Sequence, residues 1–195
     1  FYFQKPISPS DVIWTFSGVR PLFDDGSEKP EAATRGYRLD MTPEAEGAPM
    51  LSIFGGKITT YRHLAQEAVD LLAPRLSHLS AAHWTDTETL PGGGFPIDGA
   101  AKLVGEVGRL YPFLEHGWAA RLVRSYGTLT THILGDATSL ADCGHHFGHG
   151  LTEREVRYLI DREWAQSAED ILWRRSKLGL HFTAEQTAEL ERFLA

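Results

Sequence analysis

The stretch around two adjacent glycines, Gly55 and Gly56, constrains the fold more than any other part of this sequence. An apolar run ends at these glycines, and hydrophobic residues then recur at helical spacing as far as Pro74. The pattern predicts a strand, a tight turn, and a helix that begins near Thr59 or Thr60 and is capped there. Glycine permits a positive φ angle and a close approach of the backbone to a ligand.

This junction is suited to an anionic or electron-rich ligand. The free N–H groups and the positive dipole end of a helix start favour such a group, and Lys57 adds a full positive charge. The spacing matches neither a Walker A loop nor the Rossmann Gly-x-Gly-x-x-Gly fingerprint. The alternative is a plain strand-to-helix turn with a solvated lysine, and the residues alone leave both interpretations open.

Length and composition limit the class of protein. The chain has 195 residues, which is room for one domain, or for one domain and part of another. Its formal charge of −7 argues against a general nucleic-acid binder. Cys143 is the only cysteine, which precludes an internal disulfide and suits a reducing compartment. No signal peptide or membrane-length apolar stretch is visible, and the missing initial methionine suggests a fragment or a processed domain.

The chain before residue 60 has the pattern of strands and turns. Runs at residues 12–16, 34–40 and 51–54 are rich in β-branched and aromatic residues, and turn residues bound them. Three such strands do not make a self-sufficient sheet, since exposed edges need a partner or a cover. We therefore predict that residues 1–74 are the C-terminal part of a larger domain that is mostly missing here.

A connector separates that part from a helical one. Residues 75–98 contain the strongest cluster of glycines and prolines in the chain, at residues 90–96. Residues 99–195 show helical periodicity in five or six short segments, which predicts a compact helical domain. The expected fold class is therefore α+β, with a short β-rich remnant followed by a mainly α-helical C-terminal domain.

The helical part also carries signals for the ends of its elements. Capping boxes are expected at residues 152–155 and 183–186. Gly179 is expected to be the C-cap of a helix over residues 168–178. Residues 136–150 are expected to form a glycine-rich loop.

Three cations stand at the ends of the predicted strands: Arg20, Arg35 and Lys57. Guanidinium groups bind phosphate or carboxylate with two parallel hydrogen bonds. If the strands are neighbours, the three side chains would converge on one anion. The alternative is that they are surface charges or pair with nearby aspartates.

Two further clusters have both a functional and a structural interpretation. His145, His146 and His149 lie near Cys143, which invites a metal site. However, adjacent histidines rarely point the same way and no Cys-x-x-Cys pair is present, so we favour loop or packing roles and expect no metal. Cys143 also lacks the base and orienting group of a nucleophile. The carboxylates and arginines of residues 162–177 are expected to form a salt-bridged helix face.

Several segments resemble one known family. They are residues 14–22 (WTFSGVRPL), 34–35 (TR) and 54–62 (FGGKITTYR), with residues 142–149, 155–165 and 168–180 in the helical part. In one colinear order over almost the whole chain, they resemble the C-terminal part of aerobic, FAD-dependent glycerol-3-phosphate dehydrogenases.

The resemblance implies a flavoprotein that oxidises sn-glycerol 3-phosphate to dihydroxyacetone phosphate, with FAD as cofactor and a membrane quinone as electron acceptor. It implies that Arg20 and Arg35 hold the substrate phosphate. Lys57 would lie where flavin and substrate meet, as a catalytic residue. The residues expected to line the flavin are Gly55, Gly56, Lys57, Ile58 and Thr59.

The resemblance further implies a cytoplasmic protein attached peripherally to the inner face of the cytoplasmic membrane, with a homodimer as a possible assembly. Gly36 departs from the acidic or polar residue usual in the family after the arginine. The N-terminal dinucleotide-binding fingerprint is absent, so this chain lacks the groups that bind the adenine half of FAD. We therefore expect the isolated chain to hold little FAD and to turn over no substrate.

Two alternatives remain at this point. The first is a glycerol-3-phosphate oxidase, which passes electrons to oxygen and carries an insertion after the flavin motif. Residues 75–98 leave no space for a large insertion, which favours the dehydrogenase. The second is that residues 99–195 are a docking module, for which a large contiguous exposed apolar patch would be the sign.

Overall fold

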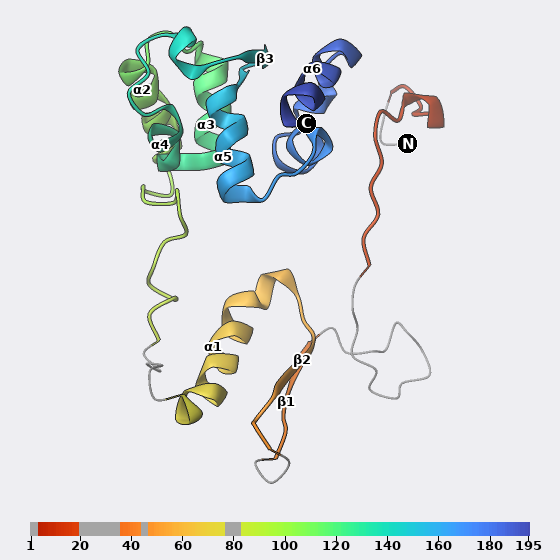
Figure 1. The fold of residues 1–195 in the computed structure, drawn as a ribbon, viewed down its shortest axis with the longest axis vertical. Helices are drawn as coiled ribbons and strands as arrows, with labels where there is room; N and C mark the ends of the chain where they lie inside the picture. The colour runs from red at the N-terminus through yellow and green to blue at the C-terminus, as the bar shows by residue number, and fades with distance from the viewer. Residues whose placement is uncertain (1–3, 20–35, 44–46, 77–82) are drawn as a thin grey trace. The chain divides into compact units, whose positions relative to one another are not determined.

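The computed structural model describes residues 4–19, 36–43, 47–76 and 83–195. The chain divides into two compact units, residues 1–88 and residues 89–195. Each unit has its own secondary structure (Figure 1). The division falls inside the segment 75–98, while the assignment of these parts to a flavin domain, a connector and a helical domain stays a prediction.

A β-hairpin and the helix that follows it are the main elements among the described residues of the first unit. Strands β1 (Tyr37–Met41) and β2 (Leu51–Gly55) pair antiparallel, with Tyr37 opposite Gly55 and Met41 opposite Leu51. The described elements, in chain order, are η1 (Pro9–Asp11), β1 (Tyr37–Met41), β2 (Leu51–Gly55), η3 (Ile58–Thr60), α1 (Tyr61–Leu72) and η4 (Ala73–Arg75). The strand predicted at residues 51–54 and the helix that ends before Pro74 are confirmed.

The start of helix α1 differs in detail from the prediction. A 3-10 turn, η3, precedes the α-helix, which begins only at Tyr61. Thr60 occupies the N-cap position without capping, because its hydroxyl donates to the carbonyl of Lys57 at 3.1 Å. The 3-10 turn places that carbonyl within reach, so the expected cap by Thr59 or Thr60 is wrong.

Residues 12–16 form no strand, contrary to the prediction. Ile13 and Phe16 are 76% and 83% exposed, and the ring of Phe16 stacks on Trp14 with centroids 5.5 Å apart. β-Branched and aromatic residues favour a strand only where a neighbouring strand completes its hydrogen bonds and packs on one face. No described strand pairs with this segment.

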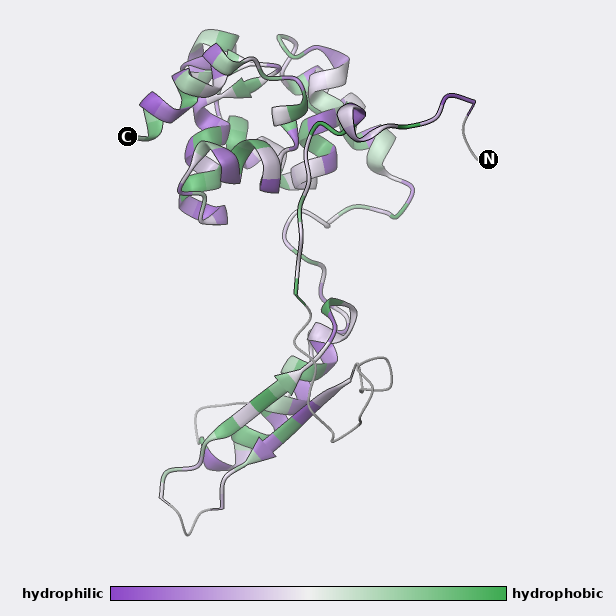
Figure 2. Cartoon of the chain, turned by 90° about the vertical axis from the view of Figure 1, so that its right-hand side faces the viewer, coloured by the Kyte–Doolittle hydropathy of each residue, from purple (hydrophilic) through white to green (hydrophobic). Residues whose placement is uncertain are grey.

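The first unit buries little apolar surface within its described residues. Ala68, which is 8% exposed, is the one buried hydrophobic residue there, whereas Ile53, Phe54 and Ile58 are exposed. Figure 2 shows hydrophobic stretches along the hairpin and the neighbouring helix. A hairpin with one helix is therefore the whole of the packing that these residues supply, which is little for an independent fold.

The second unit is mainly helical, as predicted, and the α+β class of the chain is confirmed. Its described elements are α2 (Ala100–Leu110), α3 (His116–Tyr126), η5 (Gly127–Leu129), α4 (Thr130–Leu134), η6 (Leu140–Cys143), β3 (His146–Gly148), β4 (Leu151–Thr152), α5 (Glu153–Glu163), the π-helix η7 (Asp170–Arg175), η8 (Leu178–Leu180) and α6 (Ala184–Leu194). Helices α2 to α6 gather into one bundle in Figure 1.

One continuous core holds this unit together. Its helices contribute side chains that are no more than 1% exposed: Val107, Leu122, Leu159, Ile171 and Leu190. Burial of each such side chain contributes about 1.5–3 kcal/mol to stability. The sequence shows helical periodicity because each helix turns one apolar face towards this core.

Two local predictions in this unit are wrong. The expected loop at residues 136–150 contains the 3-10 turn η6 and strand β3, which pairs with β4 through an irregular register. Gly179 is not a C-cap, since it lies inside η8 and the left-handed residue before that turn is Lys177. A Cβ atom at Gly179 would lie 2.4 Å from the ring of Trp173, so close packing explains the glycine.

One of the two predicted capping boxes is confirmed. Gln186 N donates to Thr183 Oγ at 3.3 Å, and Thr183 N donates to Gln186 Oε1 at 3.0 Å. The box predicted at residues 152–155 is wrong, because the side chain of Glu155 turns into the core instead of back to the helix end.

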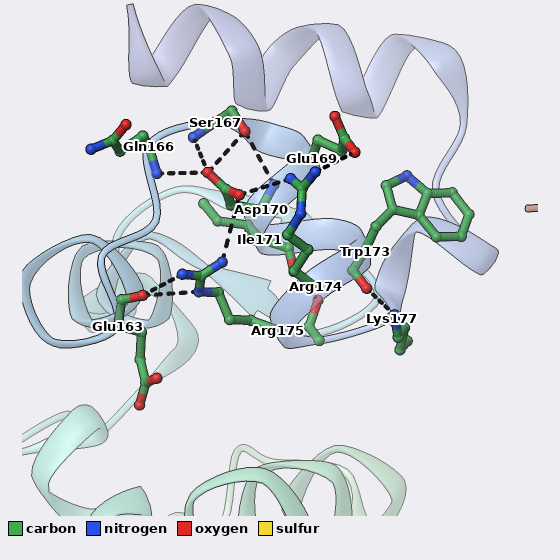
Figure 3. A network of polar contacts seen from close by, with 11 residues as sticks. Glu163, Gln166, Ser167, Glu169, Asp170, Ile171, Trp173, Arg174, Arg175 and Lys177 are labelled. Carbon is green, nitrogen blue, oxygen red and sulfur yellow. Dashed lines mark hydrogen bonds and ion pairs between the residues drawn. The ribbon is translucent and has the colours of Figure 1, made fainter. Parts of the chain in front are cut away.

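A network of polar contacts joins the end of α5 to the π-helix, and it confirms the expected salt-bridged face. Asp170 accepts hydrogen bonds from Gln166 N at 3.0 Å and Ser167 N at 3.1 Å, and it pairs with Arg174 at 2.8 Å. Arg175 Nε donates to the carbonyl of Glu163 at 3.0 Å. Figure 3 shows Asp170 between these groups. The hydrogen bond from Gln166 N is the main cause that lowers the pKa of Asp170.

Candidate functional site

The glycine turn after strand β2 is the centre of the candidate site. Gly55 and Gly56 have φ angles of 72° and 111°, which L-residues with side chains rarely adopt. Gly56 N donates to the carbonyl of Gly36 at 2.9 Å and so extends the hairpin by one hydrogen bond. A Cβ atom at Gly56 would lie 3.3 Å from the side chain of Leu64 in α1. The turn therefore brings helix α1 close against the end of the hairpin.

The residues after the turn carry main-chain donors that have no backbone acceptor among the described residues. Lys57 has an extended backbone (φ −122°, ψ 146°), and the 3-10 turn begins with Ile58. The N–H groups of Ile58 and Thr59 make no backbone hydrogen bond with any described residue. Two main-chain donors and the Lys57 ammonium thus lie within three consecutive residues, an arrangement that suits an electron-rich or anionic group.

An apolar side chain accompanies these donors. Ile58 is 90% exposed, an unusual position for a residue of its size, and Lys57 and Thr59 beside it are also exposed. An apolar side chain next to main-chain N–H groups can cover one face of a planar ring while the donors meet the polar edge of that ring. Chemically, this turn can hold a planar heterocycle and stabilise negative charge on it.

Five of the seven predicted site residues lie in this one turn: Gly55, Gly56, Lys57, Ile58 and Thr59. The other two, Arg20 and Arg35, lie outside the described residues. The convergence of Arg20, Arg35 and Lys57 on one anion therefore stays a prediction, as do the individual roles of all seven residues.

A polar chain along helix α1 was not predicted from the sequence. Arg62 Nη1 donates to Gln66 Oε1 at 3.0 Å, and Gln66 Nε2 lies 3.0 Å from His83 Nδ1. His83 Nε2 lies 3.1 Å from the Asp70 carboxylate. The chain ties the segment after the helix to the face of α1 that begins at the glycine turn. The sequence contained a signal for these contacts, because residues 62, 66 and 70 have the i, i+4 spacing of one helix face.

The histidine cluster of the second unit is held by pairwise contacts. His145 Nε2 pairs with Glu189 at 2.8 Å, and His146 Nε2 accepts a hydrogen bond from Gly150 N at 3.2 Å. Burial lowers the pKa of His146. Among the described residues, no group of three or more His, Cys, Asp or Glu side chains is placed to hold a metal ion. Burial raises the pKa of the Cys143 thiol, which opposes nucleophilic reactivity.

A buried ion pair is the other feature that the sequence did not reveal. The Glu155 carboxylate is 1% exposed and accepts from Arg121 Nη1 and Nη2 at 2.7 Å each. Tyr126 Oη donates to Glu155 at 2.7 Å, and burial raises the pKa of that phenol. The sequence around Glu155 has the spacing of a capping box, in which a glutamate stands three residues after the N-cap. That pattern therefore predicted a cap and gave no sign of the buried ion pair.

A comparison with known protein families shows to which family the chain belongs. Residues 83–194 match the family described as the C-terminal domain of alpha-glycerophosphate oxidase. The chain belongs to this family. The match covers the helical unit except its last residue, together with residues 83–88 before it.

Curated relatives extend the similarity to the first unit. The chain is 44% identical over 196 residues to the aerobic glycerol-3-phosphate dehydrogenase of Escherichia coli K12, covering 99% of this chain and 38% of that protein. It is 43% identical over 193 residues to a glycerol-3-phosphate dehydrogenase of Pseudomonas aeruginosa, covering 99% of this chain and 37% of that protein. A D-erythritol 1-phosphate dehydrogenase of Brucella abortus is 42% identical over 196 residues, covering 98% of this chain and 38% of that protein.

The chain thus spans well under half the length of the curated relatives it matches. The activities for which these relatives are named belong to whole proteins that are longer than this chain. No helix among the described residues is long and apolar enough to cross a membrane.

Proposed function

We propose that this chain is the C-terminal part of a flavoenzyme that oxidises sn-glycerol 3-phosphate to dihydroxyacetone phosphate with FAD. The observation that carries the proposal is the identity of 44% to the aerobic glycerol-3-phosphate dehydrogenase of Escherichia coli over 99% of the chain. The family match of residues 83–194 agrees with it.

The glycine turn has the chemistry that a flavin ring requires. The main-chain donors of Ile58 and Thr59 would meet the polar edge of the ring, and the exposed side chain of Ile58 would lie against its face. Gly55 and Gly56 leave space for close approach of the backbone. When bound, FAD would supply the acceptor for the two electrons removed from the substrate carbinol carbon.

The residues of this chain would bind and orient the substrate and would stabilise negative charge during its oxidation. Arg20 and Arg35 would hold the substrate phosphate through paired hydrogen bonds. The Lys57 ammonium and the N–H groups after it would stabilise negative charge that develops beside the turn during oxidation. Lys57 would therefore act at the junction of cofactor and substrate.

The parent protein would pass its electrons to a quinone from a peripheral position on the inner face of the cytoplasmic membrane. The chain alone would hold little FAD and turn over no substrate, because the groups for the adenine half of FAD lie elsewhere in the parent. An isolated chain that reduced a dye with glycerol 3-phosphate would contradict this statement.

A second candidate function differs from the first in the polyol phosphate that is oxidised. The Brucella abortus relative, a D-erythritol 1-phosphate dehydrogenase, is 42% identical over nearly the same span. Both substrates offer a phosphate and a carbinol carbon, so the turn and the two arginines serve either one. The ratio of kcat/KM for the two substrates in the parent protein separates these functions.

The deciding experiment mixes the parent protein, extended to its natural N-terminus, anaerobically with sn-glycerol 3-phosphate and follows flavin absorbance. We expect bleaching in the wild type, and a KM raised at least about tenfold in Arg20→Ala, since a charge-assisted hydrogen bond contributes about 1.5–3 kcal/mol. Arg109→Ala, an exposed charge of the helical unit, is the matched control.

The outcomes are distinct. A parent without flavin, or with flavin that neither polyol phosphate reduces, overturns the proposal. Peroxide formed in air in place of quinone reduction would assign the oxidase alternative. An equal change in KM in Arg20→Ala and Arg109→Ala would contradict the phosphate-binding role of Arg20. It would not contradict the proposed reaction.

A further inference from the structure

Thr60 makes two hydrogen bonds to one carbonyl oxygen in the turn to which the proposed function assigns the flavin. Its backbone N–H donates to the Lys57 carbonyl at 3.0 Å, and its hydroxyl donates to the same oxygen at 3.1 Å. Thr60 is half-buried, whereas Lys57, Ile58 and Thr59 before it are exposed. The hydroxyl of Thr60 is therefore used within the protein and is not offered to a ligand.

These two bonds fix the peptide unit between Lys57 and Ile58. This unit is trans, and the C=O and N–H groups of a planar trans peptide point in opposite directions. Because Thr60 holds the carbonyl towards the 3-10 turn η3, the N–H of Ile58 points to the other side. No backbone acceptor among the described residues meets that N–H. The orientation of this candidate donor is thus set by Thr60.

The residue before Lys57 is fixed by other contacts. Gly56 N donates to the carbonyl of Gly36 at 2.9 Å. A Cβ atom at Gly56 would lie 3.3 Å from the side chain of Leu64 and 3.8 Å from Cβ of Tyr37. Strand β1 and helix α1 therefore hold Gly56 from two sides.

A peptide unit between fixed neighbours keeps one easy motion. Opposite changes in ψ of Lys57 and φ of Ile58 would rotate the unit between them without displacing the chain on either side, since these two dihedrals are soft. That rotation would turn the N–H of Ile58 away from its present direction. It would also break both hydrogen bonds from Thr60, so Thr60 opposes this motion.

We propose that Thr60 is a positioning residue for the flavin, because its hydroxyl holds the Lys57 carbonyl and thereby aims the N–H of Ile58 at the cofactor. This inference rests on the proposed function, which places a flavin ring at the turn. A donor that is already oriented stabilises developing negative charge without rearrangement during the reaction. Thr60 itself acts only through the peptide that it holds.

Thr87 provides a matched control, because it makes the same pair of bonds at a turn to which no site is assigned. Its N–H and its hydroxyl donate to the carbonyl of Trp84 at 3.2 Å and 3.0 Å. The pair of bonds is therefore also a general way to close a turn. A positioning role at Thr60 requires an effect on the cofactor that the equivalent change at Thr87 does not produce.

The test uses the parent protein, extended to its natural N-terminus, with the variants Thr60→Val, Thr60→Ser and Thr87→Val. Valine keeps the branched shape of threonine without the hydroxyl, and serine keeps the hydroxyl. Three quantities are measured: the midpoint reduction potential of the bound flavin, the Kd of the flavin-free protein for FAD, and kcat and KM for sn-glycerol 3-phosphate. Thr60→Ala repeats the loss of the hydroxyl with a smaller side chain, so that a packing defect peculiar to valine is recognised.

We expect Thr60→Val to lower the midpoint potential, because a less well oriented N–H stabilises the negative charge of the reduced flavin less. The value of kcat should fall about two- to tenfold, and the Kd for FAD should rise by a similar factor, as for the loss of one hydrogen bond. KM should not change, because Arg20 and Arg35 are proposed to hold the substrate phosphate. Thr60→Ser should restore all values, and Thr87→Val should equal the wild type.

The outcomes separate this inference from the proposed function. A wild-type potential and Kd in Thr60→Val, equal changes in Thr60→Val and Thr87→Val, or no recovery in Thr60→Ser would each overturn the positioning role and leave the proposed reaction in place. Flavin that neither polyol phosphate reduces would contradict the reaction, while the potential and the Kd for FAD would still decide the role of Thr60. A parent without flavin would overturn both.

Discussion

At the scale of single residues, Glu155 shows how one side chain can override a local signal. Its sequence position fits a capping box, yet its carboxylate lies 1% exposed between Arg121 and Tyr126. A buried ion pair is costly to desolvate, and it is retained only when both charges and their remaining lone pairs are satisfied. The tyrosine hydroxyl and the two terminal guanidinium nitrogens of Arg121 satisfy the Glu155 carboxylate.

We predict that Glu155→Gln lowers the free energy of unfolding of the helical unit by about 3–5 kcal/mol, because Arg121 would keep its buried charge without a counter-ion. Urea denaturation followed by far-UV circular dichroism measures the change. Glu153→Gln is the control, since Glu153 pairs with the exposed Arg157 at 2.7 Å and such surface pairs contribute about 0–1 kcal/mol. Equal losses in the two variants would contradict the assignment of a buried pair.

At the scale of elements, short turns are held by carboxylates that accept several hydrogen bonds. Asp142 Oδ2 accepts from Thr138 N and Ser139 N at 2.9 Å each, and from both hydroxyl groups of these residues. These bonds, led by that from Thr138 N, lower the pKa of Asp142 from 3.8 to about 2. The carboxylate thereby closes the start of η6, which leads into the β3–β4 hairpin.

This linkage predicts a defined dependence of stability on pH. Because the folded-state pKa lies below the unfolded one, the charged form of Asp142 stabilises the fold above about pH 4, and that stabilisation is lost as the pH falls towards about 2. We expect Asp142→Asn to be less stable than the wild type at pH 6, with a difference that shrinks between pH 4 and pH 2. Stability curves of both proteins across this range measure it.

Asp98→Asn, at an exposed position of the same unit, serves as the control for that comparison. Its difference from the wild type should stay constant over the same pH range. A difference for Asp142→Asn that does not change with pH would show that ionisation of this carboxylate is not linked to folding.

At the scale of the whole molecule, the described residues of the two units differ in how many apolar side chains they bury. The described residues of the first unit bury one hydrophobic side chain, Ala68, whereas the second unit has a continuous core drawn from all its main helices. Stability against local opening follows buried apolar contact. The exposed apolar residues of the hairpin are consistent with a face that the remainder of the longer relatives covers.

We predict that amide hydrogens of β2 and α1 exchange with free energies of opening near zero in the isolated chain, while those of α3 and α5 approach the global value. Hydrogen exchange followed by NMR or mass spectrometry measures both sets at once. In the full-length parent, the protection of α1 should rise strongly and that of α3 should not. Similar protection of α1 and α3 in the isolated chain would contradict this difference between the units.

Elements with a strong local pattern were predictable from the sequence. Strand β2, the glycine turn, helix α1 and the helical second unit follow from periodicity and breakers, because local hydrogen bonds and one apolar face suffice to form them. The five site residues 55–59 are contiguous, so their proximity follows from covalent connection. The capping box at Thr183 was predictable for the same reason.

Only the tertiary structure decided what residues distant in the sequence do to one another. Residues 12–16 have a strand-like composition, but no strand of the described part of the chain pairs with them, and a strand needs a partner for its hydrogen bonds. Glu155 left its expected cap because Arg121, 34 positions away, offers a charge inside the core. Sequence alone determines interactions that a segment satisfies within itself, whereas packing decides those that need a partner.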